Sequence, residues 1–282
     1  MTDNSEILIQ LALAEDIGEG DVTSRYFIPE DRCACAFVAV RGDGVVSGVE
    51  LAARVFCKVD PELNVEILIA DGSRVGPGAL LIRVEGSARS ILTAERTALN
   101  FLQRLSGVAT LTARYVEEIK GTNTRILDTR KTTPGYRLLE KQAVVHGGGT
   151  NHRTGLYDRA MVKDNHLAAE GGTEAIQAAI LKLKSEKPDV EVELEADSLD
   201  QVRAFLTMEG VDYILLDNMS VDKLSEAMEM RGDRSKPLFE ASGGITLNTL
   251  REIARTGVDF ISVGVLTHSA PSLDIGLDFE AL

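Results

Sequence analysis

Residues 125–166 read RILDTRKTTPGYRLLEKQAVVHGGGTNHRTGLYDRAMVKDNH, and two short apolar runs in this stretch end in charged residues. The stretch holds eight Lys and Arg against four Asp and Glu, whereas the whole chain holds 30 against 44, so all other residues sum to −18. Cations gathered among glycines in an acidic protein predict a site for a small, highly anionic ligand. A solvated charge run is the alternative, but it would lack the apolar pairs Ile126-Leu127 and Met161-Val162 before the charges.

From Arg125 onward, strand-like and helix-like segments alternate along the sequence, as in βα units. Six strands are predicted, at residues 125–129, 159–163, 190–195, 213–217, 238–242 and 260–264. Each ends in polar residues or glycine, which a core would exclude. In a parallel barrel the carboxyl ends of all strands open on one face, where active sites form. The pattern therefore predicts an incomplete α/β (TIM-like) barrel, and an open doubly wound sheet is the alternative.

The first ninety residues follow a different pattern. A helix is predicted over 5–15, followed by strand-like runs at 33–40, 44–50, 65–70 and 80–86 that turn signals separate. These features predict a small domain of helices and strands built on an antiparallel sheet. A long helix is expected next, over 93–120, with Thr93 as its N-cap.

Composition and charge narrow the class of protein. With 282 residues the chain can bury a large core, and no apolar run approaches the ~20 residues that span a bilayer. A net charge of −14 argues against a nucleic-acid surface. The opening MTDNSEILIQ carries acids and no base, unlike a secretory or transit peptide. We therefore expect a cytoplasmic protein with no nucleic-acid or membrane partner.

Two glycine-rich loops follow the last two predicted strands. Ser242, Gly243 and Gly244 precede a helix expected near Thr246, and Gly264 ends the final strand. Glycines let backbone N–H groups approach a ligand, and a helix N-terminus favours anions. Phosphate sites recur in the loops after the last two strands of such barrels. The loops therefore predict a phosphate site, with tight βα turns that bind nothing as the alternative.

Acidic residues end the two middle strands of the predicted barrel. Glu195 and Asp217 would repel a phosphate unless a hard cation lay between them, and Mg²⁺ suits such a site. The alternative is that these acids pair with Lys131 or Lys163 and hold no metal. Glu193 points to the same side of its strand as Glu195, but Glu195 is nearer the strand end and is favoured.

Cations follow the first two strands and the glycine run between them. Arginine offers a planar fork that matches a carboxylate, whereas lysine acts as a point charge. Several cations at one cavity mouth suit a ligand with two or more negative groups. The predicted set is Arg130, Lys131, His152, Arg153 and Lys163.

Several long motifs of the sequence resemble the quinolinate phosphoribosyltransferase family. They are residues 127–166 of the opening stretch, EDIGEGDVTS (15–24), DGSRVGPGALLIRVEGSAR (71–89), ILTAERTALNFLQRLSGVAT (91–110), LLDN (215–218), EASGGI (240–245) and VGVLTHS (263–269). Together they extend over nearly the whole chain in the same order. One departure is Gln142, where an aromatic residue is expected.

This resemblance implies a fold, a reaction and an assembly. The expected fold is an N-terminal α/β open sandwich domain over 1–110, an incomplete barrel over 111–270, and a C-terminal segment over 271–282 that returns to the N-terminal domain. The expected reaction joins quinolinate and phosphoribosyl pyrophosphate, with Mg²⁺, to give nicotinate mononucleotide, pyrophosphate and CO₂ for NAD biosynthesis. The expected assembly is a homodimer with shared active sites, or a higher oligomer.

The family's functional residues carry over by motif. The two quinolinate carboxylates are expected to contact Arg130, His152, Arg153 and Lys163, with Thr129 beside them. Arg96 is expected to reach in from a partner subunit. The ribose, pyrophosphate and metal are expected to be served by Lys131, Glu195 and Asp217. The 5-phosphate is expected in the loops of Ser242, Gly243, Gly244 and Gly264.

Three other functions compete with this assignment. A paralogue of the same fold linked to molybdenum transport, or a non-catalytic phosphosugar-binding protein, would be free to lose part of the cation set. A nicotinate phosphoribosyltransferase binds a monocarboxylate and would need fewer cations. The complete set at Arg130, His152, Arg153 and Lys163 favours quinolinate over all three.

Overall fold

The computed structural model describes residues 4–163 and 172–281 and forms two compact units. The first unit contains Met1–Ala113, Thr132–Gly148 and Val265–Leu282, and the second contains Arg114–Lys131 and Gly149–Gly264. Residues 164–166, which close the motif at 127–166, lie outside the described residues. None of the described helices is long and apolar enough to cross a membrane.

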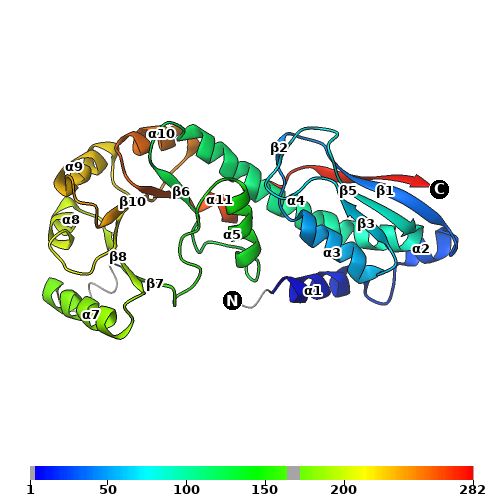
Figure 1. Cartoon of the computed structure of the whole chain (residues 1–282), viewed down its shortest axis with the longest axis horizontal. Coiled ribbons are helices and arrows are strands. Elements are labelled where there is room, and N and C mark those ends of the chain that lie inside the picture. The colour runs from blue at the N-terminus through cyan, green and yellow to red at the C-terminus, as the bar shows by residue number, and fades with distance from the viewer. Residues whose placement is uncertain (1–3, 164–171, 282) are drawn as a thin grey trace. The chain divides into compact units, whose positions relative to one another are not determined.

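An antiparallel sheet with the strand order β12-β1-β5-β3 forms the core of the first unit (Figure 1). Its elements in chain order are α1 (Ser5–Ile17), α2 (Val22–Phe27), β1 (Cys33–Val40), β2 (Gly44–Val45), α3 (Val49–Val59), β3 (Asn64–Ile67), β4 (Arg74–Val75), β5 (Leu80–Ser87), α4 (Ala88–Glu118), α5 (Arg137–His146), α11 (Val265–His268) and β12 (Ile275–Ala281). The last residues of α4, from Arg114 onward, belong to the second unit. Strand β12 pairs along β1 from Ala34↔Ala281 to Val40↔Ile275, so the chain's last strand lies on the N-terminal sheet.

The run at 44–50 was predicted as a strand, but it is a strand only over Gly44–Val45. Helix α3 begins at Val49, because two local features favour a helix start there. Gly48 adopts a left-handed φ of 93°, and the Asp71 carboxylate accepts a hydrogen bond from the Val49 backbone N–H at 2.8 Å.

Helix α4 begins at Ala88 and not at Thr93, so the predicted N-cap is wrong. Strand β5 ends at Ser87 and the chain continues directly into the helix. The Thr93 hydroxyl instead donates to the Asp21 carboxylate at 3.1 Å, an acceptor that local sequence could not reveal.

The segment 132–148 lies within the range predicted for the barrel, but it belongs to the first unit. Tyr136 stacks on Phe101 of α4 with ring centroids 5.7 Å apart. Glu140 of α5 is fully buried and forms an ion pair with Arg104 of α4 at 2.7 Å. A buried ion pair and a stacked ring therefore hold α5 to α4, and the units are not continuous stretches of sequence.

A parallel sheet with the order β6-β11-β10-β9-β8-β7 forms the centre of the second unit. Its elements are β6 (Arg125–Leu127), β7 (Arg159–Val162), α7 (Thr173–Glu186), β8 (Glu191–Ala196), α8 (Leu199–Phe205), β9 (Tyr213–Asp217), α9 (Val221–Arg231), β10 (Leu238–Ser242), α10 (Leu247–Arg255) and β11 (Phe260–Ser262). The predicted strands at 213–217 and 238–242 are confirmed to the residue.

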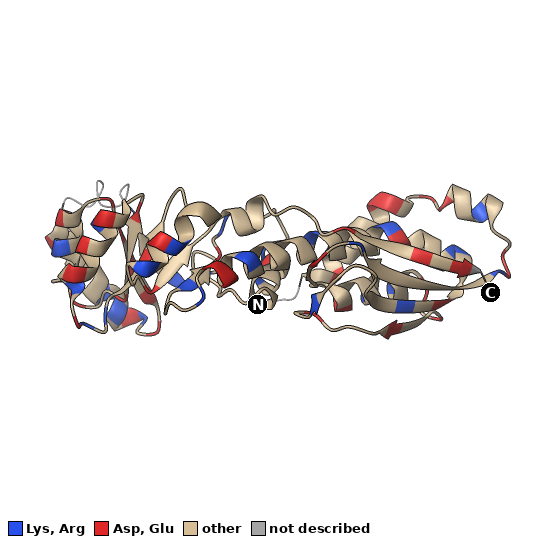
Figure 2. Ribbon diagram, turned by 90° about the horizontal axis from the view of Figure 1, so that it is seen from above, with Lys and Arg blue, Asp and Glu red and all other residues tan. Residues whose placement is uncertain are grey.

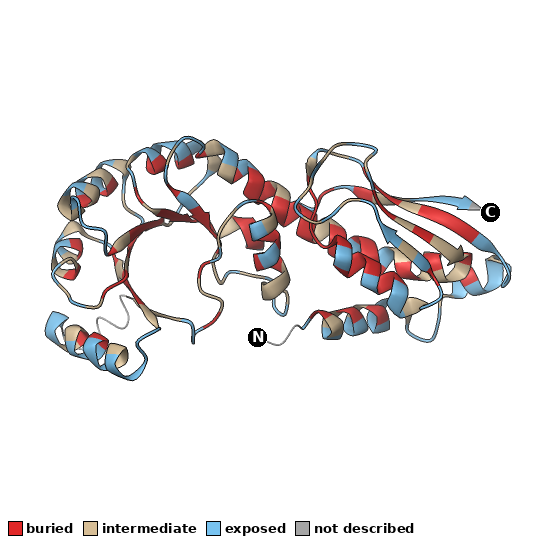
Figure 3. Ribbon diagram, in the orientation of Figure 1, coloured by how far each residue is buried: buried red, intermediate tan, exposed pale blue. Residues whose placement is uncertain are grey.

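This sheet is an incomplete barrel, as the sequence predicts. The first strand, β6, pairs with the last, β11, and no reversal of strand order provides the switch point of a doubly wound sheet. The strands curve around a centre, and helices α7 to α10 lie outside them (Figure 1). The strands are mostly buried, and each outer helix has an exposed face (Figure 3). Strands β6 and β7 are the two end strands of the sheet in its described part, and β6 forms one further parallel bridge, from Leu127 to Thr150.

Candidate active site

A cavity of about 670 Å³ opens at the carboxyl ends of the second unit's strands. Nine of the predicted site residues line it: Thr129, Arg130, Lys131, His152, Arg153, Lys163, Glu195, Asp217 and Ser242. Residues from separate segments of sequence therefore meet in one place. The sequence did not single out Arg159, Glu240 and Ser262, which also line the cavity.

We call Arg130, Lys131, Arg153 and Lys163 the rim, because all four are exposed or half-buried and line the cavity. The Arg153 guanidinium lies 3.4 Å from the Arg159 carbonyl oxygen and 3.4 Å from the Met161 sulfur, and no described carboxylate lies within 4 Å of it. Burial, followed by the nearby Arg130 charge, lowers the pKa of Arg153. The rim thus holds neighbouring guanidinium groups that an anionic ligand would stabilise.

Glu195 and Lys163 form a direct ion pair across the neighbouring strands β7 and β8. This is the pairing considered as the alternative to a metal at Glu195. The carboxylate is 14% exposed and the lysine 44%, so the pair faces the cavity and both groups remain accessible to a ligand.

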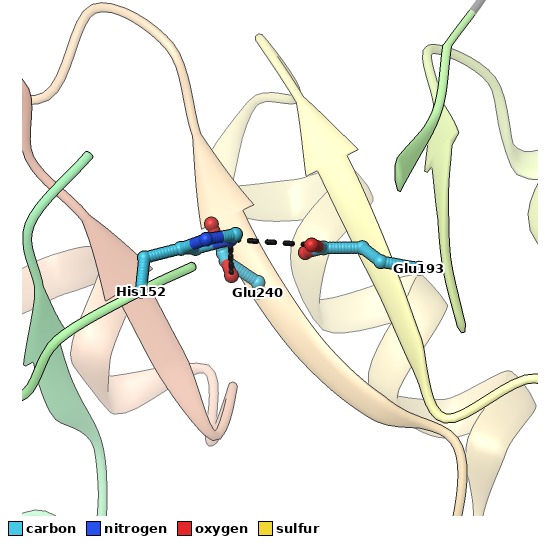
Figure 4. Close-up of side chains that lie close together, drawn as sticks. All are labelled: His152, Glu193 and Glu240. Atoms are coloured by element: carbon cyan, nitrogen blue, oxygen red, sulfur yellow. Dashed lines mark ion pairs between the residues drawn. The ribbon is translucent and has the colours of Figure 1, made fainter. Parts of the chain in front are cut away.

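We call His152, Arg159, Glu193 and Glu240 the floor of the site. Both glutamates are completely buried, and His152 is 7% exposed. The Nε2 atom of His152 lies 3.2 Å from one carboxylate oxygen of Glu193 and 3.2 Å from one of Glu240 (Figure 4). The ring therefore lies between carboxylates from strands β8 and β10.

The floor carries strongly shifted pKa values. Burial alone would lower the pKa of His152, but the Glu193 and Glu240 carboxylates outweigh it and raise the pKa to about 9. Burial and the neighbouring Glu193 charge raise the pKa of Glu240. Arg159 adds a second cation, with Nη1 3.6 Å from Glu193 and Nη2 2.9 Å from Glu191.

Asp128 fixes the backbone beside His152. This aspartate is fully buried, and one of its carboxylate oxygens accepts the His152 backbone N–H at 2.8 Å. The Asp128 N–H donates to Thr150 at 3.2 Å, and the Thr150 N–H donates to Ile126 at 2.8 Å. Residues 150–152 therefore run beside the end of β6, which brings His152 and Arg153 to the cavity.

The loops after the neighbouring strands β9 and β10 contact each other at the carboxyl ends of these strands. The Asn218 N–H donates to the Ser242 carbonyl at 2.9 Å, and its side-chain amide donates to Asp217 at 2.8 Å. Gly243 has a φ of 93°, and a Cβ at this position would lie 2.2 Å from the Asn218 side chain. Thr246 caps helix α10, near the predicted start. Gly243, Gly244 and Gly264 are described but do not line the cavity.

Glu195 and Asp217 fit the needs of Mg²⁺, because both present carboxylate oxygens to the same cavity. Mg²⁺ in proteins is commonly held by one or two carboxylates together with substrate phosphates and water. Glu193, the other acid considered, is buried at the floor between cations and does not line the cavity.

Arg96 lies on α4 in the first unit, and the cavity lies within the second unit. Its side chain is 58% exposed and lies 3.9 Å from Glu95. Its contact with the site of a partner subunit therefore stays a prediction.

Acidic residues are distributed over the helices and strands of both units (Figure 2).

Two family models match consecutive parts of the chain. The quinolinate phosphoribosyl transferase N-terminal domain matches residues 21–106, and the C-terminal domain of the same name matches residues 108–278. The chain belongs to the quinolinate phosphoribosyltransferase family. The second match contains every residue of the cavity.

Curated relatives and solved structures of this family resemble the whole chain. A mitochondrial quinolinate phosphoribosyltransferase (decarboxylating) of Nicotiana glauca is 43% identical over 97% of this chain and 81% of its own. The nicotinate-nucleotide pyrophosphorylase (carboxylating) of Mycobacterium leprae is 42% identical, over 96% and 95%. The crystal structure of NadC from Streptococcus pyogenes superposes with a TM-score of 0.92 at 38% identity and covers both chains fully.

Proposed function

We propose that this protein transfers the phosphoribosyl group of phosphoribosyl pyrophosphate to quinolinate and releases pyrophosphate and CO₂, giving nicotinate mononucleotide for NAD biosynthesis. The rim carries this proposal, because its cations line the same cavity as Glu195 and Asp217. The cations of the cavity thus suit a small dicarboxylate, and its two carboxylates suit a metal that binds a sugar with phosphates.

The rim supplies the charge that the two quinolinate carboxylates need. Arg130 and Arg153 offer planar forks, and Lys163 offers a point charge from the neighbouring strand. A quinolinate carboxylate near Arg153 and Arg130 would relieve their mutual repulsion, which contributes to the lowered pKa of Arg153. His152 and Thr129 complete this side of the cavity.

Lys131, Glu195 and Asp217 serve the phosphoribosyl pyrophosphate end in this proposal. Bound Mg²⁺ would supply positive charge to the departing pyrophosphate. Lys131 adds charge to the same leaving group, and Glu195 or Asp217 stabilises the positive charge that develops on the anomeric carbon. The 5-phosphate would bind at the loops of Ser242, Gly243, Gly244 and Gly264, and the left-handed φ values of Gly243 and Gly244 support this, because glycine lets the backbone approach a ligand closely.

The reaction needs no nucleophile from the protein. The lone pair of the pyridine nitrogen forms a bond to the anomeric carbon as the bond to pyrophosphate breaks, and pyrophosphate leaves with that electron pair. The ring nitrogen becomes cationic and draws the electrons of the adjacent carbon–carboxylate bond into the ring. CO₂ departs, and the ring carbon takes a proton from water. The residues of the site bind, orient and stabilise charge.

The assembly in this proposal is a cytoplasmic homodimer, or a higher oligomer, in which Arg96 acts across the interface. Arg96 supports it in one respect, because its side chain is mostly exposed and has no nearer anion than Glu95 among the described residues. Sedimentation of the purified protein, together with loss of quinolinate affinity in Arg96→Ala, would test this assembly. A fully active monomer would contradict it.

Turnover of the purified protein tests the proposed reaction. Quinolinate, phosphoribosyl pyrophosphate and Mg²⁺ should yield nicotinate mononucleotide, pyrophosphate and CO₂ in equal amounts. Excess EDTA should stop the reaction, and added Mg²⁺ should restore it. Binding of phosphoribosyl pyrophosphate without any product would contradict the proposal and favour a non-catalytic phosphosugar-binding protein.

Glu195→Gln tests the metal and ribose end. The substitution keeps the shape of the side chain and removes its charge, so we expect kcat to fall about 100-fold or more. The matched control is Glu191→Gln on the same strand, whose side chain is 43% exposed and lies outside the cavity. If both variants keep full kcat, the role assigned to Glu195 is wrong.

A further inference from the structure

The loop after β9 contains a strained residue to which the proposed function gives no part. Asn218, directly after Asp217, has a φ of 51° and is the one non-glycine residue with a left-handed φ among residues 4–163 and 172–281. Such conformations are costly and tend to occur at functional sites. We propose that Asn218 is a positioning residue, whose side-chain amide holds the Asp217 carboxylate in the orientation that phosphoribosyl pyrophosphate requires. This inference rests on the proposed function and adds a residue to it.

The contact between the Asn218 amide and Asp217 is direct. The amide Nδ2 donates to Oδ2 of Asp217 at 2.8 Å, and within the described residues it is the one side-chain partner of that carboxylate. Asp217 is half-buried and lines the cavity, whereas Asn218 is exposed and lies outside the cavity lining. Because a carboxylate has two acceptor oxygens, the bond to Oδ2 leaves Oδ1 available to a ligand.

The partner of Asp217 differs in kind from the partner of Glu195. Glu195 is paired with Lys163, whose positive charge offsets that of the carboxylate. The Asn218 amide is neutral, so it restricts the rotation of the Asp217 carboxylate without cancelling its negative charge. An oriented carboxylate with its full charge suits both parts proposed for Asp217, which are to hold Mg²⁺ and to stabilise positive charge on the anomeric carbon.

The Asn218 amide is itself fixed by the neighbouring strand. The Asn218 N–H donates to the Ser242 carbonyl at 2.9 Å, and Ser242 is the register partner of Asp217 in the parallel pair β9–β10. The Asn218 side chain lies against Gly243, where a Cβ would be 2.2 Å from Oδ1 of Asn218. Glycine at position 243 therefore provides the space that the amide occupies while its Nδ2 faces Asp217.

A turn residue is the competing role for Asn218. Asparagine tolerates a left-handed φ better than most residues, and it occurs in turns for that reason alone. In that role its bond to Asp217 would be incidental. Glycine separates the two roles, because it adopts this φ without steric cost and has no side-chain amide. Glycine could replace a turn residue without loss of binding, but it could not replace a positioning residue.

Calorimetry of the intact Asn218→Gly protein tests the inference. The urea midpoint should not fall, because glycine keeps the backbone conformation. The Kd for phosphoribosyl pyrophosphate with Mg²⁺ should rise about tenfold, as is usual when the hydrogen-bond partner of a metal-binding carboxylate is lost. The Kd for quinolinate, which is proposed to bind at the rim, should change less than about twofold.

Gln201→Ala is the matched control. Its side chain lies outside the cavity lining, and Oε1 accepts the Asp197 N–H at 2.8 Å in the loop after the neighbouring strand β8. This variant also removes a side-chain amide that holds a loop at the end of a strand. Both Kd values should therefore equal those of the wild-type protein.

Two results would overturn the inference. Phosphoribosyl pyrophosphate that binds Asn218→Gly with wild-type affinity would make Asn218 a turn residue, and equal weakening of both ligands would indicate a general disturbance. Wild-type protein that binds phosphoribosyl pyrophosphate but forms no product would contradict the proposed function instead, and the comparison of the two proteins would still decide the role of Asn218. Wild-type protein that does not bind phosphoribosyl pyrophosphate would contradict both.

A double-mutant cycle with Gly243→Ala tests the contact that fixes the amide. A methyl group at position 243 would displace the Asn218 side chain, so this variant alone should also raise the Kd for phosphoribosyl pyrophosphate. In the Asn218→Gly protein the amide is already absent, and the added methyl group should do less. The combined rise should therefore be smaller than the product of the two single rises. A combined rise equal to that product would overturn the joint action of Asn218 and Gly243.

Discussion

The floor and the rim both contain cationic side chains, but the two regions differ in burial and in what surrounds those cations. At the floor two buried carboxyl groups lie beside His152 and Arg159, so each has a basic neighbour inside the protein. At the rim four exposed or half-buried cations line the cavity, and Lys163 pairs with Glu195. Burial separates the two regions, because removing the partner of a charge is costly at the buried floor and less costly at the rim, which water reaches. The floor should therefore govern stability, and the rim should govern binding.

Removing the floor histidine should have the largest effect. His152→Gln leaves two buried carboxylates with only Arg159 as a cation, so we expect a loss of about 3 to 5 kcal/mol in unfolding free energy. Lys163→Ala at the rim should change stability by less than about 1 kcal/mol, because Lys163 is 44% exposed and its partner Glu195 faces the open cavity. Urea unfolding of both variants measures this contrast. Similar losses in the two would remove the distinction between floor and rim.

Removing a rim guanidinium should reverse this pattern. Arg153→Ala should raise the quinolinate KM about 100-fold, as expected for the loss of a charge-assisted contact. The KM for phosphoribosyl pyrophosphate and the urea midpoint should change little. Steady-state kinetics with each substrate varied in turn provides the measurement, and an unchanged quinolinate KM would exclude Arg153 from binding.

The floor also predicts how stability depends on pH. His152 has a folded pKa of about 9 against an ordinary 6.5, so its contribution to stability is complete below pH 6.5 and is lost as the pH rises through 9. The melting temperature should therefore fall between these values. His152→Gln should show a flatter profile over the same range, and parallel profiles would contradict the raised pKa.

The glycines of the loop after β10, where we propose that the 5-phosphate binds, offer a smaller contrast. Gly243 and Gly244 both have left-handed φ values, 93° and 61°. A Cβ at Gly243 would collide with Asn218, whereas at Gly244 nothing lies within 4 Å. Gly244→Ala should cost about 1 to 2 kcal/mol of backbone strain, and Gly243→Ala should cost more and also raise the KM for phosphoribosyl pyrophosphate. Equal effects would show that the contact with Asn218 is unimportant.

Much of the barrel and the rim could be predicted because both depend on local sequence. The strands at 213–217 and 238–242 are apolar runs with polar ends, and these ends meet because parallel strands share a direction. Two residues of the floor, Arg159 and Glu240, were missed for the opposite reason. In the sequence, Glu240 is a single acidic residue in an apolar strand. Its place in the site is evident only from its contact with His152, which lies 88 residues earlier in the chain.

The division into units was also hidden from local patterns. Residues 132–148 follow the first barrel strand, yet contacts of Tyr136 and Glu140 with α4 place them in the first unit. The helix start at Val49 likewise depends on Asp71, which belongs to a later turn. In each case the deciding partner is distant in sequence, so neither periodicity nor propensity could identify it.

The most direct test of the account is the ratio of kcat/KM for quinolinate to that for nicotinate. A rim matched to two carboxylates should leave cations unpaired with nicotinate, so quinolinate should be favoured by about 10⁴-fold or more. Arg153→Ala should reduce this ratio, whereas Glu191→Gln should not. Equal use of the two substrates, or a preference for nicotinate, would contradict the central claim that the rim recognises a dicarboxylate.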